Sequence, residues 1–179
     1  MTAEGHSKRN PHNRPIDDLV FECCRELFSD YSLDALPRGV EEFPPPERLA
    51  LCGVMGFGGR QMRGALVLAA TREPLEKSNP GGFGSQRDWI CELANQLMGR
   101  VKNRLLAVGV EILLATPAGL SGDNLNPAPG KVRTPQVFAV ESGFVCVWID
   151  CELSEGFELL MTPSGGFEAA MPEGETVLF

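Results

Sequence analysis

Two apolar runs separated by a glycine-rich turn set the fold class of this chain. The runs span residues 49–57 and 64–70, and Gly58, Gly59 and Arg60 follow the first of them. Apolar runs of this length on either side of a short glycine turn predict a β-hairpin rather than a helix. The chain is therefore expected to build part of its core from an antiparallel pair of strands.

Later apolar runs add three more strands. Residues 137–140 and 144–151 meet at a Ser-Gly turn, which predicts a second hairpin. Residues 110–116 are expected to form a buried strand that stops at Pro117, because proline has no N–H to donate within a sheet. The sequence thus predicts five strands, most of them antiparallel.

Two further segments have the three-and-four spacing of an amphipathic helix. The first begins near Pro15, and the second runs from residue 87 to about residue 107. The proline-rich residues 43–46 and the turn-rich residues 78–84 are expected to connect the elements on the surface. Because helices and hairpins follow one another in blocks, the sequence predicts an α+β fold, a largely antiparallel sheet with helices packed on one face.

The length of the chain suits one domain with extensions at both ends. Its 179 residues are 43% hydrophobic, which is enough for one core and leaves little for a second. Residues 1–14 are expected to be a flexible polar leader, and residues 15–152 are expected to form the domain. Residues 153–179 are a C-terminal extension, whose apolar residues 157–161 add an edge strand or stay loose.

The charge of the chain argues against nucleic acid as a partner. Lys and Arg total 16 against 24 Asp and Glu, a formal net charge of -8, and such a surface does not neutralise phosphates. Residues 1–15 lack the apolar core of a signal peptide, and the longest apolar stretch, residues 105–115, is too short to span a bilayer. We therefore expect a cytoplasmic protein without a membrane partner.

The chemistry of the side chains argues against a metal site or a nucleophilic catalytic pair. The two histidines, His6 and His12, lie in the polar leader, where they are expected to be solvated. The glycines at residues 56–59 are followed by Arg60 rather than by the Gly-Lys-Ser/Thr of a phosphate-binding loop. No C-x-x-C spacing occurs among the six cysteines, and their apolar surroundings favour buried, reduced thiols. They are Cys23, Cys24, Cys52, Cys91, Cys146 and Cys151.

The helix at residues 87–107 has a polar stripe opposite its apolar face. At about 100° per residue, Asp88, Glu92 and Asn95 fall within about 60° of one another. A solvated helix face is the ordinary explanation of such a stripe. Gly99 extends the stripe by one turn, although glycine costs a helix about 1 kcal/mol relative to alanine. A glycine here favours a surface on which another backbone docks.

The spacing of this stripe resembles a known signature. Asp88-x-x-x-Glu92-x-x-Asn95, followed by Pro117, resembles the D/S-x-x-x-E-x-x-N…P pattern of the CheC/CheX/FliY phosphatases. The resemblance covers about residues 15–152. It implies a CheC/CheX-like fold and an activity, hydrolysis of the aspartyl phosphate on a CheY-like response-regulator receiver domain in chemotaxis or two-component signalling.

The resemblance also implies a role for Asn95 and for Glu92. Asn95 would hold the attacking water, and Glu92 would pair with the lysine at the receiver's phosphate site. Asp88 would contact the partner or stabilise the helix start, where a carboxylate favours the helix dipole. Gly99, because of its place on the exposed helix face, is expected to let the partner approach. Pro117 is expected only to shape the end of its strand.

The partner and the assembly follow from the same resemblance. The expected partner is a phosphorylated CheY-like receiver, which brings its own Mg²⁺, so no cofactor of this chain is implied. A homodimer formed through sheet edges is also expected.

The first helix offers only part of a second motif. It contains Asp18-x-x-x-Glu22 and then Arg25 where the amide should be, so the chain is similar to the single-site CheX branch. Two alternatives remain open. One is a non-catalytic CheX/FliM-like domain that binds a receiver or a flagellar-switch partner, and the other is a structural dimer without a receiver partner.

Overall fold

The computed structural model of the chain describes residues 14–42, 49–81, 84–123, 125, 127, 134–161 and 167–170. Most of the predicted leader and the linker at residues 43–46 lie outside this part. The helices are α1 (Arg14–Ser29), η2 (Val40–Glu42), α2 (Arg72–Ser78) and α3 (Gln86–Leu106). The strands are β1 (Leu36–Arg38), β2 (Leu51–Gly59), β3 (Met62–Ala70), β4 (Ile112–Leu114), β5 (Ala118–Ser121), β6 (Gln136–Val140), β7 (Gly143–Leu153), β8 (Glu158–Met161) and β9 (Phe167–Ala170).

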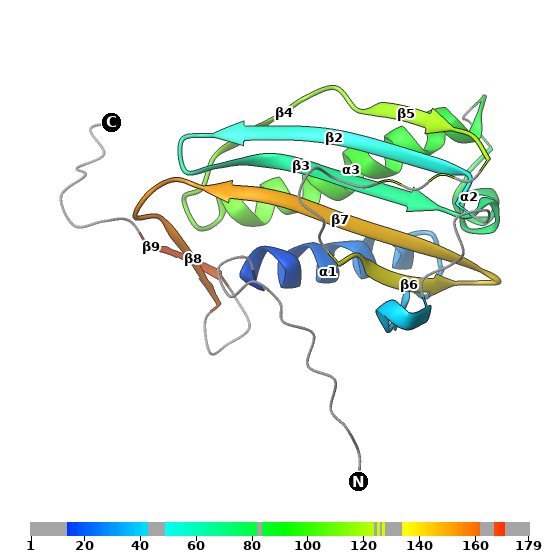
Figure 1. Cartoon of the computed structure of the whole chain (residues 1–179), viewed down its shortest axis with the longest axis horizontal. Coiled ribbons are helices and arrows are strands. Elements are labelled where there is room, and N and C mark those ends of the chain that lie inside the picture. Colours follow the sequence, from blue (N-terminus) through cyan, green and yellow to red (C-terminus); the bar gives the residue numbers. More distant parts are fainter. Residues whose placement is uncertain are drawn as a thin grey trace, which may run out of the picture.

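One large antiparallel sheet organises the described residues. Its strands run in the order β1-β6-β7-β3-β2-β4, and β5 also pairs with β2. Figure 1 shows β6, β7, β3 and β2 side by side. Both predicted hairpins are present, as β2 with β3 and as β6 with β7. The predicted α+β fold with a largely antiparallel sheet is therefore confirmed.

The two long helices cover one face of this sheet. In Figure 1, α1 and α3 lie behind the strands, and the main core fills the space between them and the sheet. Strand β7 shows how the sequence does this, since Val145, Val147 and Ile149 join that core while Cys146 and Trp148 join a smaller cluster on the other face. Alternate residues of a strand point to opposite faces, so a run that is apolar throughout has apolar groups on both.

The strand predicted at residues 110–116 is wrong in its bounds and its burial. Strand β4 covers only three residues, of which Leu113 is 71% exposed. The chain then leaves the ladder near Pro117 and returns to the same neighbour as β5. The physical reason is the position of β4 and β5 at the edge of the sheet beside β2, where no other strand among the described residues covers them.

Several short elements have no counterpart in the sequence analysis. Helix α2 precedes the turn-rich segment and includes its first residue, Ser78, and β1 is exposed along its whole length. Strand β8 pairs with β9 in a separate two-stranded sheet rather than with the edge of the large one. Phe157 and Leu159 nevertheless lie in the main core. The domain boundary at residue 153 stays a prediction.

The helices give no sign of a membrane span. None of those in the described residues is both long and apolar enough to cross a bilayer.

Candidate functional site

Helix α3 carries every residue of the predicted motif except Pro117. Its buried face is a continuous set that packs against the sheet and α1, and this set consists of Trp89, Ile90, Leu93, Ala94, Leu97, Met98, Val101 and Leu105. Asp88 and Asn95 are exposed, and Glu92 and Gly99 are partly exposed. The structure therefore brings the four predicted residues of α3 together on its outward face.

Asp88 takes part in the N-terminal cap of α3. Ser85 is the N-cap residue, and its Oγ accepts a hydrogen bond from the Asp88 backbone N–H at 3.1 Å. The same hydroxyl donates to Asp88 Oδ2 at 2.6 Å. A side-chain oxygen at the N-cap satisfies one of the free N–H groups of the first turn. Helix stabilisation is thus one task of Asp88, and a contact with a partner stays a prediction.

Glu92 is held by two other side chains. Gln96 Nε2, one turn along α3, donates to Glu92 Oε1 at 2.9 Å. The hydroxyl of Tyr31, which follows α1, donates to Gln96 Oε1 at 2.7 Å. Neither Gln96 nor Tyr31 was predicted from the sequence. The four-residue spacing from Glu92 could have indicated Gln96, whereas nothing in the sequence links Tyr31 to this helix.

Asn95 and Gly99 are both open to an approaching molecule. Within the described part of the chain, the Asn95 side chain makes no hydrogen bond, so its amide donor and acceptor face solvent. A Cβ added at Gly99 would meet nothing within 4 Å. Neither backbone strain nor internal packing explains this glycine, and the absence of a side chain leaves the helix surface accessible beside Asn95.

Two ion pairs beyond the motif join α3 to α1 and to the residue that follows α1. Arg100 pairs with Asp30, and Arg104 pairs with Glu26. All four side chains are at least 30% exposed, so each pair contributes about 1 kcal/mol or less. Their effect is to set the register of the two helices rather than to supply much stability.

The edge strand β5 flanks α3 on the other side. A Cβ at Gly119 would clash with the side chains of Cys91 and Arg87, so β5 passes directly against the first turns of α3. Pro117 lies just before β5 and is partly exposed. It occupies the interruption between the two edge strands, and a role in shaping this edge stays a prediction.

The first helix lacks an equivalent of Asn95. Arg25, at the corresponding place on α1, lies 3.8 Å from Glu22 in an ion pair whose side chains are about half exposed. A guanidinium has donors only and carries a positive charge, so it cannot replace an amide that must both donate and accept.

Five of the six cysteines are buried as predicted, whereas Cys91 is only partly buried. Burial raises the pKa of Cys23 and of Cys52 to about 11 and that of Cys146 to about 12. Cys91, which is partly exposed beside the motif, has its pKa raised by burial and by the carboxylate of Asp88. These thiols stay protonated near neutral pH, and protonated thiols are poor nucleophiles.

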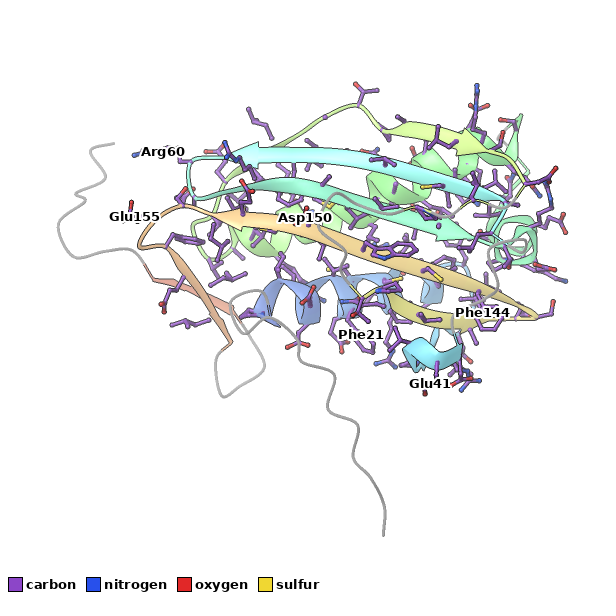
Figure 2. The ribbon with its side chains drawn as sticks, in the orientation of Figure 1. Phe21, Glu41, Arg60, Phe144, Asp150 and Glu155 are labelled. Atoms are coloured by element: carbon purple, nitrogen blue, oxygen red, sulfur yellow. The ribbon has the colours of Figure 1, made fainter. Side chains whose placement is uncertain are left out.

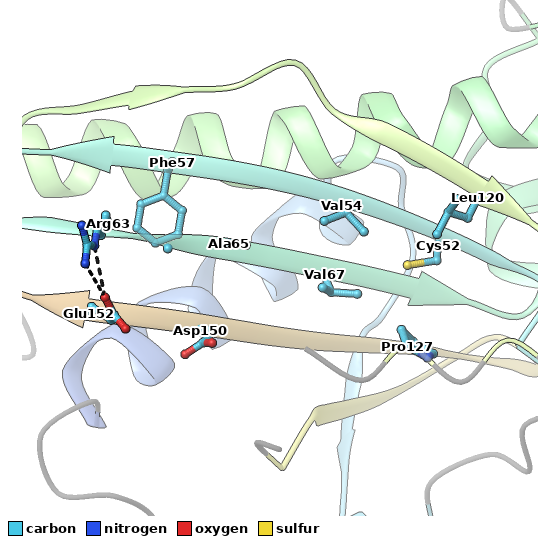
Figure 3. Close-up of a pocket in the computed structure, with 11 residues that line it drawn as sticks. Cys52, Val54, Phe57, Arg63, Ala65, Val67, Leu120, Pro127, Asp150 and Glu152 are labelled. Atoms are coloured by element: carbon cyan, nitrogen blue, oxygen red, sulfur yellow. Dashed lines mark hydrogen bonds and ion pairs between the residues drawn. The ribbon is translucent and has the colours of Figure 1, made fainter. Parts of the chain in front are cut away.

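A separate groove of about 670 Å³ lies on the sheet face that the helices leave uncovered (Figure 3). Its floor includes Val54 and Val67, and Asp150 projects from β7 along one side (Figures 2 and 3). At one end Arg63 donates to Glu152 at 3.0 and 3.1 Å. Of the described residues that line the groove, none belongs to the motif. The groove and the motif are on opposite sides of the sheet.

Solved structures show which fold this arrangement represents. The chain resembles a CheC-like superfamily protein from Shewanella sp. PV-4, with a TM-score of 0.66 and 19% identity over 80% of this chain and 99% of that one. It resembles CheX from Vibrio vulnificus with a TM-score of 0.61 and 21% identity over 80% and 100% of the two chains. It also resembles a chain of the CheX-CheY-BeF3-Mg²⁺ complex from Borrelia burgdorferi, with a TM-score of 0.50 and 13% identity over 80% and 99%.

By sequence, no family model and no curated protein matches this chain. The structural likeness confirms the expected CheC/CheX-like fold.

Proposed function

We propose that this chain, which has the fold of the CheC-like and CheX chemotaxis proteins, is a phosphatase for the aspartyl phosphate of a CheY-like receiver domain. The observation that carries the proposal is the outward face of α3. There an amide without an internal partner, Asn95, lies one turn from a carboxylate, Glu92, that is already held in place.

The reaction leaves few tasks for the catalyst. Phosphoryl transfer needs positioning and charge stabilisation more than covalent chemistry. The receiver would contribute Mg²⁺ and a lysine that neutralise the phosphoryl oxygens, so the remaining task is to orient a water molecule in line with the bond that breaks. The Asn95 amide suits this task because it can donate and accept without bringing a negative charge toward an anionic group.

Docking would fall to the other residues of the stripe. The Glu92 carboxylate would form an ion pair with the receiver's lysine and so fix the register of the two proteins. Gly99 would allow the receiver backbone to approach α3. The solved complex of CheX with CheY supports a partner of this kind, since its CheX chain shares the present fold.

Replacing Asn95 by alanine tests the proposal. We expect Asn95→Ala to lower the rate of assisted phosphate release by about 10²-fold or more, as loss of one preorganised polar group does, while the receiver still binds. The measurement is phosphate release from phosphorylated receivers at saturating receiver concentration. Asn103→Ala is the matched control, because it removes an exposed asparagine from the same helix outside the motif.

Two other outcomes of this experiment would contradict the proposal. Equal rates for Asn95→Ala and the wild type would exclude the proposed role of the amide. A wild type that binds phosphorylated receivers without accelerating phosphate release would instead be a non-catalytic binding domain for a receiver or a flagellar-switch partner.

A further inference from the structure

We propose that Gln96 and Tyr31 are positioning residues, which hold the Glu92 carboxylate in its docking orientation before a receiver arrives. The inference rests on the proposed function, because it concerns how well Glu92 performs the docking role given to it there. Neither residue belongs to the motif in the sequence.

The hydrogen bonds that link Tyr31, Gln96 and Glu92 can be donated only in the direction of Glu92. An ionised carboxylate only accepts hydrogen bonds, so Gln96 has to direct its NH₂ group at Glu92. Its carbonyl oxygen then faces Tyr31, and the phenol has to donate to it. The observed bonds agree, with 2.7 Å from the Tyr31 hydroxyl to Gln96 Oε1 and 2.9 Å from Gln96 Nε2 to Glu92 Oε1.

Tyr31, at the far end of this series of hydrogen bonds, is anchored in the core. The ring of Tyr31 meets that of Trp89 edge to face, with centroids 5.5 Å apart and an interplanar angle of 88°. Trp89 is only 1% exposed, and its Nε1 donates to Ser78 Oγ at 2.9 Å. The backbone of Tyr31 is also fixed, since its N–H donates to the Phe28 carbonyl at 3.0 Å. The hydroxyl thus occupies a defined place relative to α3.

These hydrogen bonds leave one oxygen of the Glu92 carboxylate available to a partner. Glu92 Oε1 accepts from Gln96, and no described residue bonds to Oε2. A glutamate on a helix surface ordinarily samples several rotamers and loses that freedom when it binds. Here much of the ordering happens during folding, so less of the docking free energy is lost to it when a lysine arrives.

The two neighbouring amides consequently have different tasks. Gln96 uses both ends of its amide within the protein. The exposed Asn95 amide forms no hydrogen bond with a described residue. Adjacent helical residues point about 100° apart, which separates the amide that orients Glu92 from the amide that would orient water.

Two substitutions remove the hydrogen bonds with little change in shape. Tyr31→Phe deletes only the hydroxyl and keeps the ring against Trp89. Gln96→Met keeps the length of the side chain and removes both polar atoms. We expect each to raise the Kd for phosphorylated receiver roughly two- to tenfold, the usual cost of ordering one long side chain, with kcat at saturating receiver unchanged. Asn103→Ala is the control for both.

A double-mutant cycle with Glu92→Gln separates positioning from a general effect on the fold. Once the docking charge is gone, Tyr31→Phe should cause no further loss of affinity. Thermal unfolding of each variant shows that it is folded before binding is compared.

The outcomes distinguish the inference from the proposed function. If the wild type does not bind phosphorylated receivers, both are wrong. If Glu92→Gln weakens binding but Tyr31→Phe and Gln96→Met bind like the wild type, the positioning inference alone is wrong. It is also wrong if Tyr31→Phe weakens binding equally with and without Glu92, or if either variant lowers kcat while Kd is unchanged.

Discussion

Glu92 and Asn95 share one helical face, yet the folded chain treats their side chains differently. The carboxylate is tied to Gln96, whereas the exposed amide bonds to no described residue. A group that must form an ion pair gains from being held, because it meets its partner without losing freedom. A group that must bind water gains from being unoccupied. This difference supports one docking residue and one residue for chemistry.

Neutralising Glu92 should therefore affect binding more than turnover. We expect Glu92→Gln to weaken receiver binding roughly tenfold or more and to make the remaining affinity less sensitive to salt. The variant keeps an acceptor for Gln96, so it removes the charge without removing the internal bond. Titrations at several salt concentrations measure both effects.

The matched control for this substitution is Glu111→Gln, which makes the same change in net charge at an exposed residue outside α3. Tight binding of Glu92→Gln together with lost turnover would assign Glu92 to the chemistry and contradict the division of roles.

Single residues of the site were predictable to different degrees. Asp88, Glu92, Asn95 and Gly99 follow from the period of one helix, and a helical period is a local property. Tyr31 lies 65 positions from Gln96, and their contact depends on how α1 packs on α3. Spacing along one segment contains no information about such a contact.

Helix α3 combines stable ends with a weak point at Gly99. Ser85 caps its start, and the backbone N–H of Val110 bonds to the Leu105 carbonyl beyond its last turn. Gly99 lies between these ends in open space. Glycine allows the unfolded chain more freedom than alanine and so lowers helix stability. The helix gives up stability at the place where we propose that a receiver docks.

Substitutions of Gly99 should separate stability from docking. We expect Gly99→Ala to raise the free energy of unfolding by about 1 kcal/mol, because its Cβ would meet nothing within 4 Å outside the helix backbone. Gly99→Leu should remain folded for the same reason but weaken receiver binding at least tenfold by blocking close approach. Chemical denaturation and receiver titration measure the two effects.

Gly58→Leu, the same change on β2 at a position where a Cβ also meets nothing within 4 Å, is the control for added bulk. Unchanged binding of Gly99→Leu would mean that no backbone docks at this position.

The elements were predictable where their apolar pattern was long. Both hairpins, α1 and α3 follow from periodicity over many residues. Strand β1 has three exposed residues and includes Pro37, so it shows no alternation. Helix α2 has only seven residues, and Pro74 in its first turn suggests a loop although proline is tolerated there. The bounds of β4 and β5 depend on their position at the sheet edge, which only the assembled sheet defines.

The whole molecule exposes apolar groups at both edges of its sheet. Leu36 on β1 is 51% exposed, and Leu113 on β4 and Leu120 on β5 are 71% and 53% exposed. Edge strands offer unpaired backbone groups to another chain unless they are covered. An edge with exposed leucines favours pairing with a second copy.

We expect the protein to be a homodimer joined through a sheet edge at micromolar concentration. Light scattering measures the assembly. If the β4 edge is used, Leu113→Lys should shift the protein toward the monomer, because a charged side chain discourages strand pairing. Leu106→Lys is the control, since Leu106 is similarly exposed but ends a helix. A monomeric wild type would contradict the prediction.

The central pairing of β3 with β7 has a consequence for how the chain folds. The Arg63–Glu152 pair joins these strands across 89 positions, whereas each hairpin closes over a few residues. Contacts that are distant in sequence must overcome a larger loop-closure entropy and slow the folding of β-rich chains. Helix α3 lies in the segment between Arg63 and Glu152, so its outward face reaches its final position only after β3 pairs with β7. The chain's two tryptophans, Trp89 on α3 and Trp148 on β7, would report that slow step by fluorescence, and the surface for a receiver should form with it rather than earlier.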